Sequence, residues 1–511
     1  MTLSNNLIRR LSVGSDGRHD APFAYMPDGS TVTYGQLWAD VNRTAAALLA
    51  AGVTPGDRVA VQAQKSLQML HLVLGAQLAG GVILPLNTAY TANEIAYFLG
   101  DAEPAVFICD PAAEAALAPI AKSAGVKTLA TLSADGTGSW ADRVAAAPSD
   151  PVDVPRTAED LGGILYTSGT TGRSKGAMLT HEALASNAEV LKDYWRFTKD
   201  DVLIHALPIF HTHGLFVATN TTLVAGGSII FMPKFDPDAI LAAMPRATAM
   251  MGVPTFYTRL LDHPGLTREA VANMRLFVSG SAPLLAETHD RWRETTGHAI
   301  LERYGMTETN MNTSNPYDGD RRAGTVGFPL PGVEVIVTNP ETGEAVPTGE
   351  IGAIEVRGPN VFAGYWRMPE KTKEEKRENG FFITGDLGVY DERGYLTLVG
   401  RSKDLIITGG FNVYPKEIEG LIDDMDGVKE SAVIGLPHPD FGEGVAAVVV
   451  KDGEADVSEA SILDALKDEL ARFKQPKRVF FVDELPRNTM GKVQKAALRE
   501  TYADTFAKTT A

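Results

Sequence analysis

The segment 165–176, Leu-Tyr-Thr-Ser-Gly-Thr-Thr-Gly-Arg-Ser-Lys-Gly, has the composition of a phosphate-binding loop. It holds five Ser/Thr residues, three glycines and two cations, and the apolar residues 163–166 at its start predict a strand. Hydroxyls, backbone N–H groups and positive charge in a turn after a strand can bind the phosphates of a nucleotide. The segment is not a Walker A loop, because Gly176 follows Lys175 where that motif requires Ser or Thr. The composition alone is equally typical of a surface loop.

Three other segments hold residue types that suit nucleotide chemistry. In Tyr304-Gly305-Met306-Thr307-Glu308, the aromatic ring can stack on adenine and the carboxylate can hold the Mg²⁺ of a triphosphate. Asp386, in Thr384-Gly385-Asp386, can accept hydrogen bonds from both hydroxyls of a ribose. The small residues of Ser279-Gly280-Ser281-Ala282-Pro283 leave room for a flat base or an acyl group. Each segment alone is also typical of an ordinary turn or a surface charge.

Length, charge and cysteine content restrict the class of protein. With 511 residues the chain is long enough for two or more domains with large cores. The net charge of −17 argues against nucleic acid or an anionic membrane as a partner, because both attract basic surfaces. Cys109 is the only cysteine, and the first ten residues lack the apolar core of a signal peptide. We therefore expect a cytoplasmic protein without disulfides.

Short apolar runs alternate with helical patterns through the first 300 residues, which predicts an α/β fold with wound sheets. Strands are expected at 57–61, 82–86, 105–109, 202–206, 228–232 and 276–279, and helices at 36–49, 66–80 and 285–296. The run 332–357 has short strands broken by Asn, Pro and Gly, and predicts a small β-rich module.

The last hundred residues read as a small α+β domain. Helices are expected at 415–424 and 459–474, and strands at 405–407, 431–435, 445–450 and 478–482. The best candidate for the boundary is the polar turn 400–404, which divides the chain into 1–402 and 403–511. Residues 442–447 fit the dinucleotide pattern G-x-G-x-x-A, but they lead into a strand instead of opening a helix, so we discount them.

Together these motifs resemble the adenylate-forming superfamily, which includes acyl-CoA synthetases, aryl-CoA ligases, luciferases and peptide-synthetase adenylation domains. The resemblance rests on 165–176, 303–309, 384–386 and the C-terminal loop 486–495, in which Pro486 leads to Gly491-Lys492. The loop departs from many relatives, because Asn488 stands where a threonine is usual. The resemblance implies a large N-terminal domain, a small mobile C-terminal domain, and the substrates ATP, with Mg²⁺, and coenzyme A.

The resemblance also assigns roles to individual residues. Lys492 would stabilise the negative charge of the adenylation transition state, and Lys403 would be the hinge about which the small domain rotates. Glu308 and Thr167 would bind the metal and, with His211 and Lys492, form the catalytic set. The expected ATP-binding residues are Thr167, Ser168, Gly169, Thr170, Thr171, Gly172, Lys175, Ser281, Ala282, Pro283, Tyr304, Gly305, Thr307, Asp386 and Arg401. The expected CoA-binding residues are Gly409, Gly410 and Lys474.

Two features of the sequence bear on the acid substrate, residues 302–314 and Arg291. Residues 302–314 resemble malonyl-CoA synthetases, which implies malonate, with methylmalonate as a further candidate. His211, Ser281 and Met306 would surround the acyl group, and Arg291 would pair with the distal carboxylate. The competing interpretation places Arg291 on a solvated helix face and makes the substrate a short-chain, medium-chain or aryl monocarboxylic acid.

Functions of other classes fit less well. A non-catalytic nucleotide-binding relative would be expected to have a degraded 167–175 loop or no Lys492, and both are intact. A metallohydrolase built on His211 and His213 lacks a glutamate motif. A peptide-synthetase module would need a carrier domain, and a luciferase-like oxygenase would need a less polar pocket. In the superfamily, acylation of the lysine at the position of Lys492 can switch activity off, so a lysine acyltransferase and a deacylase are expected partners.

Overall fold

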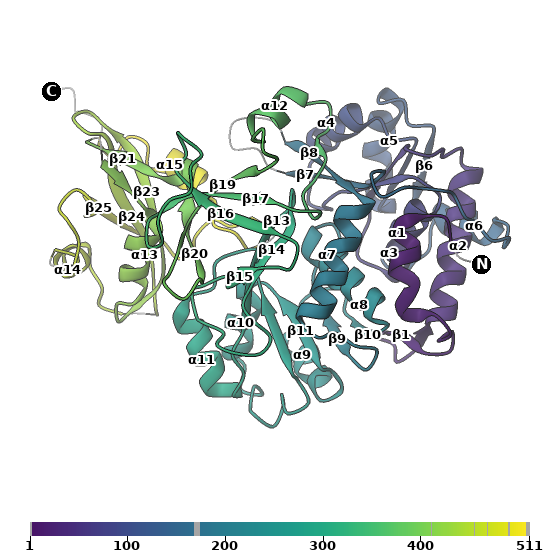
Figure 1. The fold of residues 1–511 in the computed structure, drawn as a ribbon, viewed down its shortest axis with the longest axis horizontal. Coiled ribbons are helices and arrows are strands. Elements are labelled where there is room, and N and C mark those ends of the chain that lie inside the picture. Colours follow the sequence, from purple (N-terminus) through teal and green to yellow (C-terminus); the bar gives the residue numbers. More distant parts are fainter. Residues whose placement is uncertain are drawn as a thin grey trace.

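The computed structural model describes residues 3–167, 174–409, 411–453, 455–467, 469–488 and 491–506. These residues form four sheets, two large ones in the N-terminal part, a small one beside them, and one in a C-terminal lobe at the far end of the molecule (Figure 1). Among the described residues, no helix is both long and apolar enough to cross a membrane.

A seven-stranded sheet carries the predicted phosphate loop. Its order is β18-β8-β7-β4-β3-β5-β6. The strands β3 to β7 are parallel and buried, as the apolar runs predict, while β8 and β18 are antiparallel additions. The bounds are β3 Arg58–Gln62, β4 Val82–Pro85, β5 Val106–Cys109, β6 Thr128–Thr131, β7 Leu161–Thr167, β8 Lys175–Thr180 and β18 Gly364–Tyr365. Because β7 and β8 form a hairpin, Thr167 lies directly opposite Lys175.

A nine-stranded sheet carries the other site residues. Its order is β15-β14-β13-β12-β11-β9-β10-β1-β2, with a parallel centre and antiparallel edges. The bounds are β1 Pro22–Tyr25, β2 Thr31–Thr33, β9 Val202–His205, β10 Ser228–Phe231, β11 Ala249–Gly252, β12 Leu276–Ser279, β13 Leu301–Met306, β14 Asn310–Ser314 and β15 Phe328–Pro329. Ligand sites in such sheets lie beyond the carboxyl ends of the parallel strands, where the chain turns.

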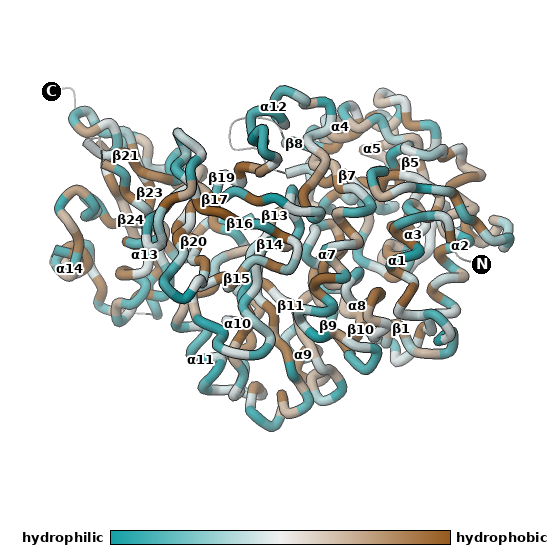
Figure 2. The backbone as a smooth tube through the Cα atoms, viewed as in Figure 1, coloured by the Kyte–Doolittle hydropathy of each residue, from teal (hydrophilic) through white to brown (hydrophobic). Residues whose placement is uncertain are grey.

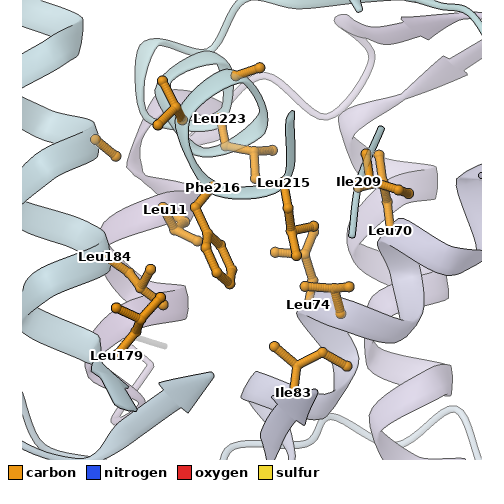
Figure 3. Packing of buried hydrophobic residues seen from close by; sticks show 14 of the residues in the cluster. Leu11, Leu70, Leu74, Ile83, Leu179, Leu184, Ile209, Leu215, Phe216 and Leu223 are labelled. Carbon is orange, nitrogen blue, oxygen red and sulfur yellow. The ribbon is translucent and has the colours of Figure 1, made fainter. Parts of the chain in front are cut away.

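Helices between the two large sheets form the main core. Figure 3 shows apolar side chains of α1, α3, α7 and α8, of β4 and β8, and of the π-helix His213–Ala218 meeting in one cluster. In this cluster Phe216, Leu74, Leu184 and Ile83 are almost fully buried. The helices of this part are α1 Asn6–Ser12, α2 Tyr34–Ala50, α3 Leu67–Leu78, α4 Ala92–Ala102, α5 Glu114–Ser123, α6 Ser139–Ala146, α7 His181–Tyr194, α8 Thr219–Ala225, α9 Pro237–Ala243, α10 Pro254–Leu261 and α11 Ala286–Thr296.

A four-stranded antiparallel sheet, β16-β17-β19-β20, follows, as the β-rich composition of 332–357 predicts. Its bounds are β16 Glu334–Thr338, β17 Gly352–Arg357, β19 Phe382–Tyr390 and β20 Leu396–Arg401, with α12 Pro369–Glu374 between β17 and β19. The C-terminal lobe has its own core on a sheet of β21 Ile406–Thr408, β22 Phe411–Val413, β23 Val428–His438, β24 Gly442–Lys451 and β25 Arg478–Phe481. Its helices are α13 Pro415–Asp423, α14 Glu459–Ala465 and α15 Lys495–Thr501. Figure 2 shows hydrophobic strands, in brown, at the centre of this lobe. Elsewhere in the molecule, the surface helices α11 and α12 are hydrophilic.

The predicted α/β class and nearly all predicted strands are confirmed, with ends shifted by a few residues. Residues 442–447 begin strand β24 and do not open a helix, as a dinucleotide-binding loop would. One prediction is wrong, because the helix expected over 459–474 ends at Ala465. Beyond it, the side chain of Gln475 donates to the carbonyls of Lys467 and Leu470, which turns the chain toward β25.

The packing of the core between the two large sheets predicts how two leucine substitutions differ in their effect on stability. Leu74→Ala should lower the free energy of unfolding by about 2–5 kcal/mol, because Leu74 is 2% exposed and its removal leaves a cavity. Leu49→Ala removes the same atoms from a side chain that is 37% exposed, so the loss should stay below about 1 kcal/mol. Urea unfolding followed by tryptophan fluorescence measures both, and equal losses would contradict the packing described.

Candidate active site

A cluster of polar side chains surrounds the base of the β7–β8 hairpin. The Thr167 hydroxyl lies 3.4 Å from Glu308 Oε1. Lys175 Nζ donates to Glu375 Oε1 at 2.9 Å and lies 4.0 Å from the centre of the Tyr365 ring. The Tyr365 hydroxyl lies 3.1 Å from Glu308 Oε1 and 2.7 Å from Glu375 Oε2. Hydroxyl, ammonium and carboxylate groups from distant parts of the chain therefore meet on either side of the segment predicted to bind phosphate.

Glu308 is the buried carboxylate of this cluster. It follows β13 in the turn to β14, and only 5% of the residue is exposed. Burial raises the pKa of the Glu308 carboxyl above its ordinary value. A buried carboxylate whose neighbours are a hydroxyl and a phenol is stabilised by a cation, and oxygen donors of this kind suit Mg²⁺. The donor set thus fits the metal that accompanies a nucleotide triphosphate.

Tyr304, Asp386 and Arg401 form a second group at the end of the small β-sheet. The Tyr304 hydroxyl donates to Asp386 Oδ2 at 2.6 Å, and Arg401 Nε lies 3.1 Å from Asp386 Oδ1. Asp386 and Arg401 are paired across β19 and β20, so the sheet register fixes their contact. Tyr304 is 6% exposed, and burial raises the pKa of its phenol well above the ordinary value. An acceptor and a donor held side by side in this way can bind ribose hydroxyls and phosphate.

Lys492 reaches this group from the C-terminal lobe on a tight turn. Gly491, at φ +74°, occupies a left-handed conformation that favours glycine, and Asn488 Oδ1 accepts a hydrogen bond from Lys492 N at 3.0 Å. The turn faces α10, because a Cβ built on Gly491 would lie 3.5 Å from the Thr255 side chain. Burial, reinforced by the charge of Arg401, lowers the pKa of the Lys492 ammonium to about 8.

Histidines line the other side of the site. His211 and His213 lie at the start of the π-helix His213–Ala218, and Ser281 Oγ is 3.2 Å from His213 Nδ1. Ser281 has a φ of +73°, a strained conformation for a residue with a side chain. Burial and the positive charges of Arg303 and Lys492 lower the pKa of His211 to about 4, so this imidazole is neutral at neutral pH.

Arg303 is a buried cation for which the described residues provide no counter-ion. It is 4% exposed, and its Nε and Nη2 atoms have no hydrogen-bond partner among the described residues. A Cβ built on Gly280 would lie 2.3 Å from Arg303 Cζ, so the guanidinium rests against a position that only glycine can fill. Burial lowers the pKa of Arg303 to about 9. An unpaired buried guanidinium is costly unless a bound anion neutralises it.

The structure places Arg291 at the surface, whereas Arg303 is buried near His211. Arg291 lies on the outer face of α11, where its side chain is 53% exposed and sits 3.8 Å from Glu287 in an i,i+4 pair. The buried face of α11 is formed by Thr288, His289, Trp292 and Thr296. This spacing turns position 291 away from the core.

The other expected residues fall into three groups. Ala282, Gly305, Met306 and Thr307 are half-buried beside Ser281 and Tyr304, while Pro283 is exposed. Lys403 is exposed in the 3-10 turn Ser402–Asp404, Gly409 is exposed in the lobe, and Lys474 is engaged by Glu417 at 2.6 Å. Ser168, Gly169, Thr170, Thr171, Gly172 and Gly410 lie outside the described residues.

Sequence reasoning gave no role to Arg303, Tyr365 or Glu375. Arg303 directly precedes Tyr304, and a cation inside a buried strand is a signal that could have identified it. Tyr365 and Glu375 carry no local signal, because β18 and α12 reach Lys175 only through the pairing of β18 with β8.

Comparisons with known proteins identify the family of this chain. The pattern of the AMP-binding enzyme family matches residues 14–366, and that of the AMP-binding enzyme C-terminal domain matches 417–492. A malonate–CoA ligase of Arabidopsis thaliana is 34% identical over 93% of this chain and 86% of its own length. The crystal structure of ATP-bound MatB from Rhodopseudomonas palustris is 62% identical, with a TM-score of 0.96 over 99% of this chain and all of that one. The apo MatB structure of the same organism, with the same coverage, gives a TM-score of 0.85. This chain belongs to the AMP-binding enzyme family.

Proposed function

We propose that this protein joins malonate to coenzyme A at the expense of ATP. In the first step a malonate carboxylate oxygen attacks the α-phosphorus of ATP, and pyrophosphate leaves. In the second step the thiol sulfur of CoA attacks the acyl carbonyl, and AMP leaves. Forming the adenylate converts a poor leaving group into a good one. The choice of malonate as the acid rests on the buried, unpaired guanidinium of Arg303. The similarity to a malonate–CoA ligase supports this choice.

The distal carboxylate of malonate would bind Arg303. A planar guanidinium can donate two parallel hydrogen bonds to a carboxylate, and the neutral His211 and the Ser281 hydroxyl can complete the acyl pocket. A neutral acid would leave the guanidinium unpaired, which selects against monocarboxylates. Methylmalonate has the same two carboxylates and is the second candidate substrate.

Lys492 would act on the first half-reaction. Its ammonium lies on the same side of the site as Arg401 and Asp386, so it can contact the carboxylate and the α-phosphate as negative charge accumulates there. Tyr304 would stack on adenine, and Asp386 with Arg401 would hold the ribose. Acylation of Lys492 by a lysine acyltransferase would remove this charge, and a deacylase would restore it.

Glu308, with the Thr167 hydroxyl, would hold Mg²⁺ together with the ATP phosphates. The bound metal would neutralise phosphate charge. The residues at the ends of the hairpin would orient the triphosphate, since Lys175 and Thr167 flank the loop.

The C-terminal lobe would supply the CoA site. We propose a domain boundary at 402/403 with Lys403 as the hinge, and CoA contacts from Gly409, Gly410 and Lys474. Lys474 would have to leave Glu417 to bind a CoA phosphate. A cytoplasmic location is also proposed, on the basis of the single cysteine.

A substrate panel tests the function. Pyrophosphate release with ATP, Mg²⁺ and CoA should be fastest with malonate or methylmalonate and much slower with succinate, acetate, butyrate and benzoate. The preference follows from the need to neutralise Arg303 at a fixed distance from the reacting carboxylate. A preference for acetate, butyrate or benzoate would reject malonate and keep the adenylation chemistry.

Replacing each arginine in turn tests whether Arg303 or Arg291 binds malonate. Arg303→Met should lower kcat/KM for malonate by about 30-fold to several thousand-fold, the effect of removing one partner of a buried charge pair. Arg291→Met should leave kcat/KM within about twofold, because Arg291 is half exposed and lies on the outer face of α11. Steady-state kinetics of both variants, with thermal unfolding as the folding control, decides between them. The opposite ranking would restore the original assignment.

The pKa of Lys492 predicts a pH dependence. The ammonium is charged below a pKa of about 8 and neutral above it, so kcat/KM for adenylation should fall as the pH rises through 8. In Lys492→Arg the cation persists to higher pH, so any remaining activity should lack this fall. Pyrophosphate release from about pH 6.5 to about pH 8.5 measures both below the pKa of Arg303, and an unchanged profile in the variant would assign the titration to another group.

A further inference from the structure

The ion pair between Lys175 and Glu375 lies inside the site proposed for the ATP phosphates. Lys175 Nζ lies 2.9 Å from Glu375 Oε1, and Lys371 Nζ lies 3.2 Å from the same oxygen. The other oxygen of Glu375 accepts a hydrogen bond from the Tyr365 hydroxyl at 2.7 Å. The cation that flanks the phosphate loop is therefore already neutralised by a carboxylate of the protein.

Tyr365 is shared between two carboxylates. Its hydroxyl has one proton, and it lies closer to Glu375, at 2.7 Å, than to Glu308, at 3.1 Å. When the phenol donates to Glu375, the oxygens of Glu308 do not accept that proton and their lone pairs stay available for a cation. Glu375 thus fixes the orientation of Tyr365 as well as the position of Lys175.

The fold holds Glu375 in this position. It directly follows α12, and its backbone carbonyl accepts a hydrogen bond from Ile383 N at 2.8 Å, in the strand that leads to Asp386. The Thr372 hydroxyl of α12 accepts a hydrogen bond from Tyr365 N at 2.9 Å. Two backbone links therefore connect α12 to the strands that carry the site, which a chance surface ion pair would lack.

We propose that Glu375 is a positioning residue of the nucleotide site, which holds Lys175 in place of a phosphate and releases it when a nucleoside triphosphate binds. The inference rests on the proposed function, because it assumes that ATP binds between Lys175 and Glu308. A phosphate competes with Glu375 for Lys175, so ATP binds at the cost of breaking this ion pair. Glu375 also keeps Lys175 folded over the Tyr365 ring until that exchange.

The direct test is the affinity of the whole protein for ATP with EDTA present and malonate absent, measured by calorimetry. Under these conditions no adenylate forms. Glu375→Gln keeps an acceptor for Tyr365 but removes the charge that competes with phosphate. The dissociation constant for ATP should fall about threefold to tenfold, the range for a partly exposed ion pair.

A matched control and a double-mutant cycle isolate the mechanism. Glu374→Gln removes the same charge one residue earlier, from a side chain that is 65% exposed and does not contact Lys175, and should change the dissociation constant by less than about 1.5-fold. Lys175→Met should weaken ATP binding. Adding Glu375→Gln to Lys175→Met should then produce no tightening, because the ion pair is already lost.

The outcomes separate the inference from the proposed function. An unchanged or weaker affinity in Glu375→Gln, or equal tightening in Glu374→Gln, overturns the inference. Tightening that persists in the Lys175→Met background overturns it too, because the effect would not pass through Lys175. Unchanged ATP binding in Lys175→Met rejects the nucleotide site itself. If Glu375→Gln does not fold, as judged by circular dichroism, Glu375→Ala is measured in the same way.

Discussion

The free-energy cost of a buried, unpaired guanidinium is the constraint around which this site is organised. Arg303 lies in a chain with a net charge of −17, yet none of the described carboxylates pairs with it. Gly280 gives the guanidinium its space, and burial keeps His211 and His213 neutral beside it. The site therefore keeps local positive potential against an acidic background, which is what a dianionic substrate and a triphosphate require.

Charged side chains also meet beside the β7–β8 hairpin. Lys175 is paired with Glu375, while Glu308 remains a buried carboxylate beside a hydroxyl and a phenol. A cation held by the protein's own carboxylate and a second, buried carboxylate thus lie within one cluster. The β7–β8 hairpin positions them, because its register sets Thr167 against Lys175 and its partner strand β18 brings in Tyr365.

The C-terminal lobe contributes Lys492 to the candidate site. Lys492 lies on a turn that Gly491 and Asn488 shape, and the turn faces α10 of the large domain. In this arrangement its pKa is lowered by burial and by the charge of Arg401, and both come from packing the lobe on the large domain. A rotation of the lobe would remove both effects together.

The sequence by itself determined the elements and the chemical inventory. Apolar runs predicted the buried strands, and the types and spacing of polar residues predicted a phosphate loop and made Glu308, Asp386 and Lys492 candidate site residues. These features are local, so a single sequence contains them. Tertiary structure decided which of two arginines is buried. Arg291 and Arg303 are chemically equivalent in the sequence, but helix periodicity turns Arg291 outward while the buried strand β13 carries Arg303 inward. The contacts of Tyr365 and Glu375 with Lys175, and the lowered pKa of Lys492, depend on segments far apart in the chain, and only their packing brings them together.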